Sequence, residues 1–297
     1  MLDRIINKEI ITTKAGYFLI GHIIAMVFGL AGLLLVLPHP EFIMNLPPIG
    51  QSAFSWSMIG GGVVYMVLGW VAIALYAYNQ LGLWHWLGFM LPALGISLTS
   101  ELLGTSTGFP FGAYHYLSGL GYKIAGLVPF TIPLSWFYLG FSSYLIARVG
   151  LNKLNIANWL KDLGAIVFGA LLLTSWDFVL DPAMSQTSVP FWQWDQPGEF
   201  FGMPYQNFIG WFGTGVVFMT VATLIWRMKP LEWGKISLTI PFLVYLGNFG
   251  FAMIMSIGAG FYIPILLGIF LGIMPLLFFI KLAYNEEETD NTQLVIN

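Results

Sequence analysis

The chain contains a series of long apolar segments, each close to the length at which a helix crosses a lipid bilayer. Such a crossing takes about 20 mostly apolar residues, and helices are one of two structures that satisfy every backbone hydrogen bond in lipid. We therefore predict an all-α integral membrane protein, a bundle of about eight transmembrane helices. The predicted spans cover residues 15–37, 52–78, 83–104, 127–148, 159–180, 206–227, 236–258 and 261–282.

The amino-acid composition supports this class and excludes a soluble fold. Of the 297 residues, 58% are hydrophobic and only 8% are charged, whereas soluble domains carry roughly 25% charged residues. The sequence contains no cysteine, so disulfides and thiolate chemistry are excluded. We predict a single polytopic membrane domain over residues 1–297, with no role in binding nucleic acid.

The basic residues favour a cytoplasmic location for both termini, because Lys and Arg accumulate in cytoplasmic loops. With eight spans, Lys123 alone falls on the outer side. The basic residues on the other side are Arg4, Lys8, Lys14, Arg148, Lys153, Lys161, Arg227, Lys229, Lys235 and Lys281. This orientation makes residues 1–14 a cytoplasmic N-terminus and residues 283–297 a short C-terminal tail. It suits a prokaryotic cytoplasmic (inner) membrane.

Three carboxylates lie near the outer ends of predicted spans. Glu101 belongs to the third span, and Asp177 and Asp181 to the fifth. Charge is costly at this depth, and intramembrane acids usually mark a pathway or an active site. Asp177 and Asp181 are four residues apart and would share a helix face, so one of them could keep a proton and act as a general acid. Alternatively, these acids cap loops or protrude into water.

Two long outer loops, about 105–126 and 183–205, follow these acidic helix ends and are rich in glycine and aromatic residues. We expect them to fold onto the helix ends or to lie in the membrane interface. His115, between Tyr114 and Tyr116, could relay a proton or orient water, or be an ordinary interfacial histidine. The four histidines lack metal-ligand spacing, so we expect no metal and no cofactor.

Other polar or small residues within the spans indicate helix packing. His22 and Asn248 are expected to form hydrogen bonds between helices. The run Gly60–Gly62, and the pair Gly268 and Gly272, are expected to let neighbouring helices approach closely.

The two loops also carry a resemblance to a known family. The segment Glu101-Leu-Leu-Gly-Thr-Ser-Thr-Gly-Phe-Pro-Phe-Gly-Ala-Tyr-His-Tyr116 resembles the signature of the integral-membrane carotenoid biosynthesis proteins, which include carotenoid 1′,2′-hydratases. The segments Asp177-Phe-Val-Leu-Asp-Pro182, Trp192-Gln-Trp194 and Gly202-Met-Pro-Tyr-Gln-Asn-Phe-Ile-Gly-Trp211 resemble the second half of that family. The resemblance covers about residues 85–215, and the flanking spans match in hydropathy only.

The resemblance implies addition of water to the terminal C1′=C2′ bond of an acyclic carotenoid ψ-end, giving a tertiary 1′-hydroxy carotenoid. γ-Carotene, lycopene and bisanhydrobacterioruberin are substrates of this kind. Glu101 and Asp177 become the leading acid/base pair, assisted by Asp181 and His115. The candidate substrate-binding residues are Phe111, Tyr114, Tyr116, Trp176, Trp192, Trp194, Asn207 and Trp211. The partners would be a membrane-embedded carotenoid and water, and could include other carotenoid-pathway enzymes.

The residues suit this chemistry, because protonating an alkene needs a general acid and Trp or Tyr faces can stabilise a cation by about 0.5–2 kcal/mol each. Two alternatives stay open. A membrane terpene or carotenoid end-group cyclase would share the protonation step but close a ring. A lipid or isoprenoid transporter or scaffold would suit the faint likeness between spans three–four and five–six.

Overall fold

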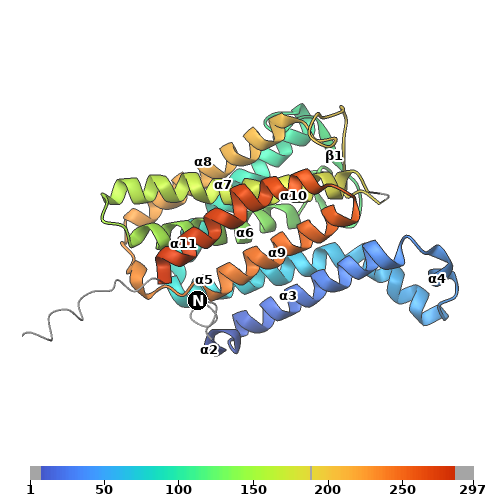
Figure 1. The fold of residues 1–297 in the computed structure, drawn as a ribbon, viewed down its shortest axis with the longest axis horizontal. Helices are drawn as coiled ribbons and strands as arrows, with labels where there is room; N and C mark the ends of the chain where they lie inside the picture. The colour runs from blue at the N-terminus through green and yellow to red at the C-terminus, as the bar shows by residue number, and fades with distance from the viewer. Residues whose placement is uncertain (1–7, 188, 285–297) are drawn as a thin grey trace, which may run out of the picture.

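Most of the chain is helical in the computed structural model, which describes residues 8–187 and 189–284 (Figure 1). Residues 1–7 and 285–297, the latter most of the predicted C-terminal tail, lie outside the described part. The long helices are α3 (Lys14–Ala31), α5 (Pro48–Thr107), α6 (Thr131–Asn152), α7 (Asn158–Ser185), α8 (Tyr205–Arg227) and α9 (Thr239–Gly258). The last helical segment joins α10 (Tyr262–Gly268), the π-helix η3 (Ile269–Ile273) and α11 (Met274–Tyr284).

Short elements connect these helices. The short helical elements are α2 (Lys8–Ile11), the π-helix η1 (Gly32–Val36), α4 (Pro40–Met44) and the 3-10 helix η2 (Trp233–Lys235). The strands are β1 (Tyr114–Tyr116), β2 (Lys123–Ile124), β3 (Val128–Pro129) and β4 (Trp192–Trp194).

The helix α5 changes direction at Gly82. Within its 60 residues, Gly82 has non-helical backbone angles, φ 78° and ψ 170°, which glycine adopts without a steric penalty. Two helices therefore meet at this residue. The first half lies beside α3, and the second half ends near β1 (Figure 1). The predicted boundary between spans 52–78 and 83–104 falls at this break.

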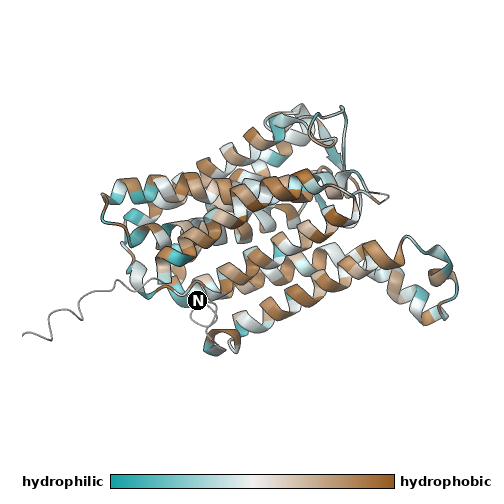
Figure 2. Ribbon diagram, viewed as in Figure 1, coloured by the Kyte–Doolittle hydropathy of each residue, from teal (hydrophilic) through white to brown (hydrophobic). Residues whose placement is uncertain are grey.

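Six helical segments in the described part of the chain are long and apolar enough to cross a membrane. They are Lys14–Val36, Pro48–Thr107, Asn158–Ser185, Tyr205–Arg227, Thr239–Gly258 and Tyr262–Tyr284. Figure 2 shows apolar residues along the helix bodies and hydrophilic residues gathered toward the two ends of the bundle. The prediction of a helical protein with membrane-type helices is confirmed in this form.

The helix α6 is enclosed by other helices and is not among these six. Its side chains from Thr131 to Leu151 are buried, apart from the half-buried Leu134, and it packs against α5, α7, α9 and α11. Because it is surrounded by protein, it can carry hydroxyl groups, and most of them, though not that of Ser143, find hydrogen-bond partners within the bundle. Ser142, for example, donates to the carbonyl oxygen of Tyr138 at 2.7 Å.

Polar side chains link four helices across the middle of the bundle. The Nδ1 atom of His22 lies 2.6 Å from the carbonyl oxygen of Tyr65, and its Nε2 atom lies 2.9 Å from Nδ2 of Asn248. The Tyr138 hydroxyl donates to Oδ1 of Asn248 at 3.3 Å. These contacts join α3, α5, α6 and α9, in the packing role expected of His22 and Asn248.

The glycines that were predicted to allow close helix packing fall into two groups. A Cβ atom at Gly268 would lie 2.2 Å from Cγ2 of Val179, and one at Gly272 would lie 2.4 Å from Oγ of Ser175. Gly62 is similarly confined, 2.5 Å from the carbonyl oxygen of Gly119. These three positions permit the close packing predicted for them. At Gly60 and Gly61, however, a Cβ atom would meet nothing within 4 Å, so the prediction of close packing fails there.

The two outer loops meet through β1 and β4. These strands pair antiparallel, with Tyr114 opposite Trp194 and Tyr116 opposite Trp192. Successive side chains of a strand point to opposite faces, so the four aromatic residues share one face and His115 lies on the other. The pairing therefore brings aromatic side chains from both loops to the ends of α5 and α7.

An ion-pair cluster lies at the other end of the bundle. Asp162 accepts hydrogen bonds from Nε of Arg148 and from Nε of Arg227, both at 2.9 Å. The side chains of Arg148 and Asp162 are only 5% and 11% exposed. The guanidinium of Arg148 also lies 4.2 Å from the ring centroid of Trp233.

We predict that Asp162→Asn lowers the thermal unfolding midpoint of the detergent-purified protein. Removing one partner of a buried ion pair costs about 3–5 kcal/mol, because it leaves a buried charge without compensation. Glu232→Gln is the control, since its pair with Lys235 is exposed and should contribute little. Equal midpoints for wild type and Asp162→Asn would contradict the stabilising role of this cluster.

Candidate active site

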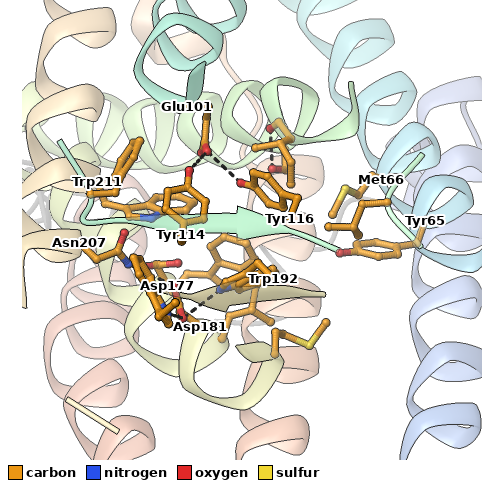
Figure 3. A pocket seen from close by; sticks show the side chains of 18 residues that line it. Tyr65, Met66, Glu101, Tyr114, Tyr116, Asp177, Asp181, Trp192, Asn207 and Trp211 are labelled. Carbon is orange, nitrogen blue, oxygen red and sulfur yellow. Dashed lines mark hydrogen bonds between the residues drawn. The ribbon is translucent and has the colours of Figure 1, made fainter. Parts of the chain in front are cut away.

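A cavity lies under the β1–β4 pair, between the C-terminal ends of α5 and α7 and the N-terminal parts of α6 and α8 (Figure 3). Its volume is about 50 Å³. Its lining consists of Tyr65, Met66, Glu101, Phe111, Tyr114, Tyr116, Leu120, Ile132, Ser135, Trp176, Asp177, Leu180, Asp181, Met184, Trp192, Trp194, Asn207 and Trp211.

Glu101, near the end of α5, is 2% exposed and accepts hydrogen bonds from three aromatic side chains. The hydroxyls of Tyr114 and Tyr116 both donate to Oε2, the latter at 2.9 Å. The indole N–H of Trp136, on α6, donates to Oε1 at 2.8 Å. Both carboxylate oxygens are therefore hydrogen-bonded, as an acceptor-only ionised carboxylate requires.

Asp181, near the end of α7, is held by the second loop in a similar way. The indole N–H groups of Trp192 and Trp194 donate to its Oδ1 atom at 3.2 and 3.0 Å. Ser185, one helical turn further along α7, donates to the same oxygen at 3.2 Å. The Oδ2 atom accepts from Nδ2 of Asn207 at 3.3 Å. Four donors thus surround this carboxyl group.

Asp177 has fewer partners than the other two acids. Its Oδ2 atom accepts from Nδ2 of Asn207 at 2.8 Å, and within the described residues this is its one hydrogen bond. Asn207, in the first turn of α8, also donates to Asp181. One amide group therefore bridges two carboxyl groups that lie a helical turn apart on α7.

The cavity holds three acids and no base. Among the residues that the structure describes, no Lys, Arg or His lines it. An ionised carboxylate in a dry interior costs several kcal/mol unless hydrogen bonds compensate. Aromatic N–H and O–H groups provide this compensation for Glu101 and Asp181, and Asp177 receives much less. The arrangement can hold a proton beside an apolar ligand.

Aromatic rings form much of the remaining wall. Trp211, in the wall, stacks on Trp136 behind it, with ring centroids 3.9 Å apart and an interplanar angle of 15°. Trp176 meets Trp211 edge-on at 5.9 Å. Tyr114 lies against Trp194 at 5.1 Å. Such electron-rich faces can stabilise a cation formed within the cavity.

The phenols of the β1 strand act as donors. Burial raises the pKa of the Tyr114 hydroxyl well above its usual range, and the nearby Glu101 carboxyl raises it further. The pKa of Tyr116 is raised for the same reasons. Both hydroxyls therefore keep their protons at neutral pH and remain available to hydrogen-bond Glu101.

The structure brings together every candidate residue except His115. Those that line the cavity are Glu101, Phe111, Tyr114, Tyr116, Trp176, Asp177, Asp181, Trp192, Trp194, Asn207 and Trp211. His115 instead points away on the opposite face of β1 and pairs with Oδ1 of Asp195 at 2.7 Å. Both side chains of that pair are about half exposed. An assisting role for His115 inside the cavity does not fit this geometry.

Neither Trp136 nor Ser185 was predicted from the sequence, although both donate to a cavity carboxylate. The sequence feature that could have indicated a role for Trp136 is an indole N–H group inside an apolar segment, because such a group needs a hydrogen-bond acceptor when it is buried. Its partner, however, lies 35 positions earlier in the chain, and spacing alone does not reveal so distant a contact. Ser185 follows Asp181 by one helical turn, a spacing that could have indicated the contact.

Within residues 8–187 and 189–284, no group of three or more His, Asp or Glu side chains is placed to hold a metal ion. The acids of the cavity face N–H and O–H donors instead.

Comparison with known proteins places this chain in a family. The sequence model of the carotenoid biosynthesis protein family matches residues 61–275, a region that contains all three cavity acids. Because the match covers more than half of the chain, the chain belongs to the carotenoid biosynthesis protein family. The resemblance noted in the two loop motifs is thereby confirmed.

A curated relative carries a more specific name. The chain is 31% identical over 195 residues to the bisanhydrobacterioruberin hydratase of Haloarcula japonica, covering 65% of this chain and 61% of that protein. The chain thus spans about three fifths of the length of the curated relative it matches. No solved structure matches the chain significantly.

We predict that Trp136→Phe destabilises the protein by about 1–3 kcal/mol, because it leaves Oε1 of the buried Glu101 without its donor. The change would be measured as a fall in the thermal unfolding midpoint. Trp159→Phe is the matched control, since Trp159 is 60% exposed. A fall of the same size in both variants would show that the hydrogen bond is not the cause.

Proposed function

We propose that this protein is a carotenoid hydratase that adds water to the terminal C1′=C2′ bond of an acyclic ψ-end and forms a tertiary alcohol at C1′. The observation that carries the proposal is the unequal solvation of three buried acids in one aromatic cavity. Asp177 has one hydrogen-bond donor, whereas Glu101 and Asp181 have three and four. Family membership and the name of the relative support a carotenoid substrate.

Asp177 is the proposed proton donor. A buried carboxyl group with a single donor is least costly in its neutral form, and a neutral carboxylic acid beside an alkene can act as a general acid. Its proton is transferred to C2′, and the electron pair of the C1′=C2′ bond forms the new C–H bond. This step leaves an ionised Asp177 and a tertiary cation at C1′.

The cavity wall would stabilise that cation. The rings of Trp211 and Trp176 line the cavity and present electron-rich surfaces to it. Glu101, which accepts hydrogen bonds from three donors, would supply a fixed negative charge when it is ionised. Because these groups are held in place before the reaction, they need no reorganisation as the charge develops.

Water then attacks C1′ and loses a proton to Asp181. The shared amide of Asn207 places Asp181 next to Asp177, so the proton can return to Asp177 and restore the starting state. The sum of the steps is the addition of one water molecule to one double bond. The substrate would be of the γ-carotene, lycopene or bisanhydrobacterioruberin type.

We also propose eight membrane crossings with both termini in the cytoplasm of a prokaryotic cell. Counting the halves of α5 on either side of Gly82 separately, and adding the enclosed helix α6, extends the six apolar segments to eight. The one-sided distribution of Lys and Arg supports this orientation. The cavity would then open toward the outer leaflet.

Cysteine labelling tests the orientation, and the chain is suited to it because it contains no cysteine. We predict that Tyr122→Cys, in an exposed part of the first outer loop, reacts with a membrane-impermeant maleimide in intact cells. Asn155→Cys, between α6 and α7, should react only after the membrane is permeabilised. The reverse pattern would rule out cytoplasmic termini.

Substitution of the proton donor tests the reaction. In a host that makes lycopene or γ-carotene, wild-type protein should yield a carotenoid heavier by one water. Asp177→Asn should lower the rate of its formation by about 10²–10⁴-fold, the usual contribution of a general acid. His115→Gln should stay near wild type, because His115 lies outside the cavity. Pigments would be separated and weighed by mass spectrometry, with yields normalised to folded protein.

Three outcomes would contradict the proposal. Hydrated product from Asp177→Asn at the wild-type rate would remove the assigned acid. A wild-type product of unchanged mass would indicate a cyclase. Accumulation of unmodified carotenoid with the wild-type protein would indicate a binding or transport role.

A further inference from the structure

We propose that an apolar groove next to the cavity binds the polyene chain of the substrate, remote from the reacting bond. This inference rests on the proposed function and locates the rest of the ligand. The groove lies between α3 with η1 and the first half of α5, and Phe251 of α9 adds to its lining. Its volume is about 420 Å³.

The groove adjoins the acid-lined cavity. Tyr65, Leu120 and Met184 line both spaces, so these three side chains form the boundary between them. In Figure 3, Tyr65 stands at the edge of the cavity nearest α3 and the first half of α5, with its hydroxyl turned toward the cavity. A long ligand that passes between these three side chains would place its end group among the acids while its chain lies in the groove.

The surface of the groove suits a flat apolar chain. At Gly32, Gly60 and Gly61 a Cβ atom would meet nothing within 4 Å, so these positions present bare backbone to open space. Phe251 stacks on Tyr65 with ring centroids 5.8 Å apart and an interplanar angle of 26°. Flat rings and bare backbone leave a slot for a planar conjugated chain, and apolar, aromatic lining is typical of ligand sites.

The uncharged lining and the length of the groove both suit a polyene chain. In the part of the chain that the structure describes, no charged side chain lines the groove. Trp56 and Tyr65 mark its ends on α5 and are nine residues apart, about 13 Å at the helical rise per residue. A carotenoid about as long as the 30 Å hydrocarbon core would fill the groove and continue into lipid. Trp56 and Phe28 are 79% and 66% exposed and border that opening.

The groove can be filled without disturbing the acids. Gly61→Leu adds a side chain to open space, and leucine favours a helix more than glycine does. Gly95→Leu is the matched control, because Gly95 also faces open space and lies beyond Gly82, away from groove and cavity. Gly32→Leu narrows the groove from the α3 side and should act like Gly61→Leu.

Two quantities should be measured for each variant in a carotenoid-producing host. The first is the carotenoid that co-purifies with the protein, read as pigment absorbance per protein in an Asp177→Asn background. The second is hydrated product in the wild-type background. We expect Gly61→Leu to lower both by about tenfold, equivalent to excluding about two methylene groups from the groove. Gly95→Leu should match its parent in both.

The two measurements separate the two proposals. Equal pigment binding by the Gly61→Leu and Gly95→Leu variants would overturn the groove assignment, even if the protein hydrates carotenoids. Pigment binding that depends on Gly61, with no hydrated product from wild type, would support the groove and overturn the hydratase. Co-purified phospholipid acyl chains that depend on Gly61, with carotenoid binding unchanged, would identify the groove as a lipid site and overturn the inference.

Discussion

The structure depends on hydrogen bonds that stabilise buried carboxylates in an apolar interior where no cation lies beside them. A buried carboxylate without partners is costly, and no basic side chain from the described residues reaches the cavity. Indole N–H and phenol O–H groups stabilise Glu101 and Asp181 instead. These donors have rings that are themselves apolar, so they can approach the acids closely without admitting bulk water. The same side chains thus provide hydrogen bonds and a dry wall.

The pairing of β1 with β4 brings aromatic N–H and O–H donors to the acids. The positions of these donors along the chain follow a regular pattern. Glu101 and Asp181 each receive two aromatic donors from the loop that follows their own helix. Tyr114 follows Glu101 by 13 residues, and Trp194 follows Asp181 by 13 residues; the same two aromatic residues stand opposite each other in the strand pair. The faint likeness between spans three–four and five–six therefore corresponds to a likeness of local structure around one shared cavity.

Much of this arrangement could be predicted from the sequence, and the failures have specific physical reasons. Hydropathy placed the apolar segments and even the break at Gly82, because lipid imposes a length on each helix. The acids were identified because charge is costly in membrane-type segments, and the loop aromatics because both loops follow acidic helix ends and resemble the family motifs. His115 was misplaced because the alternation of a short strand was not foreseen. Trp136 was missed because its contact joins separate helices, and Gly60 and Gly61 were taken for packing positions because a sequence does not show what lies opposite a glycine.

The chain reverses direction within α5 at Gly82, and the parts before and after this glycine contribute to different sites. The residues before this glycine line the groove, and the residues after it carry Glu101. The family match begins only at residue 61, so α3 and the first turns of α5 lie outside it. If the groove holds the polyene and the cavity the acids as proposed, substitutions before the bend would alter which chain lengths are accepted while the proton chemistry stays intact. Such a division would let one proposed catalytic centre diversify among pigments through changes in helices that lie apart from the acids.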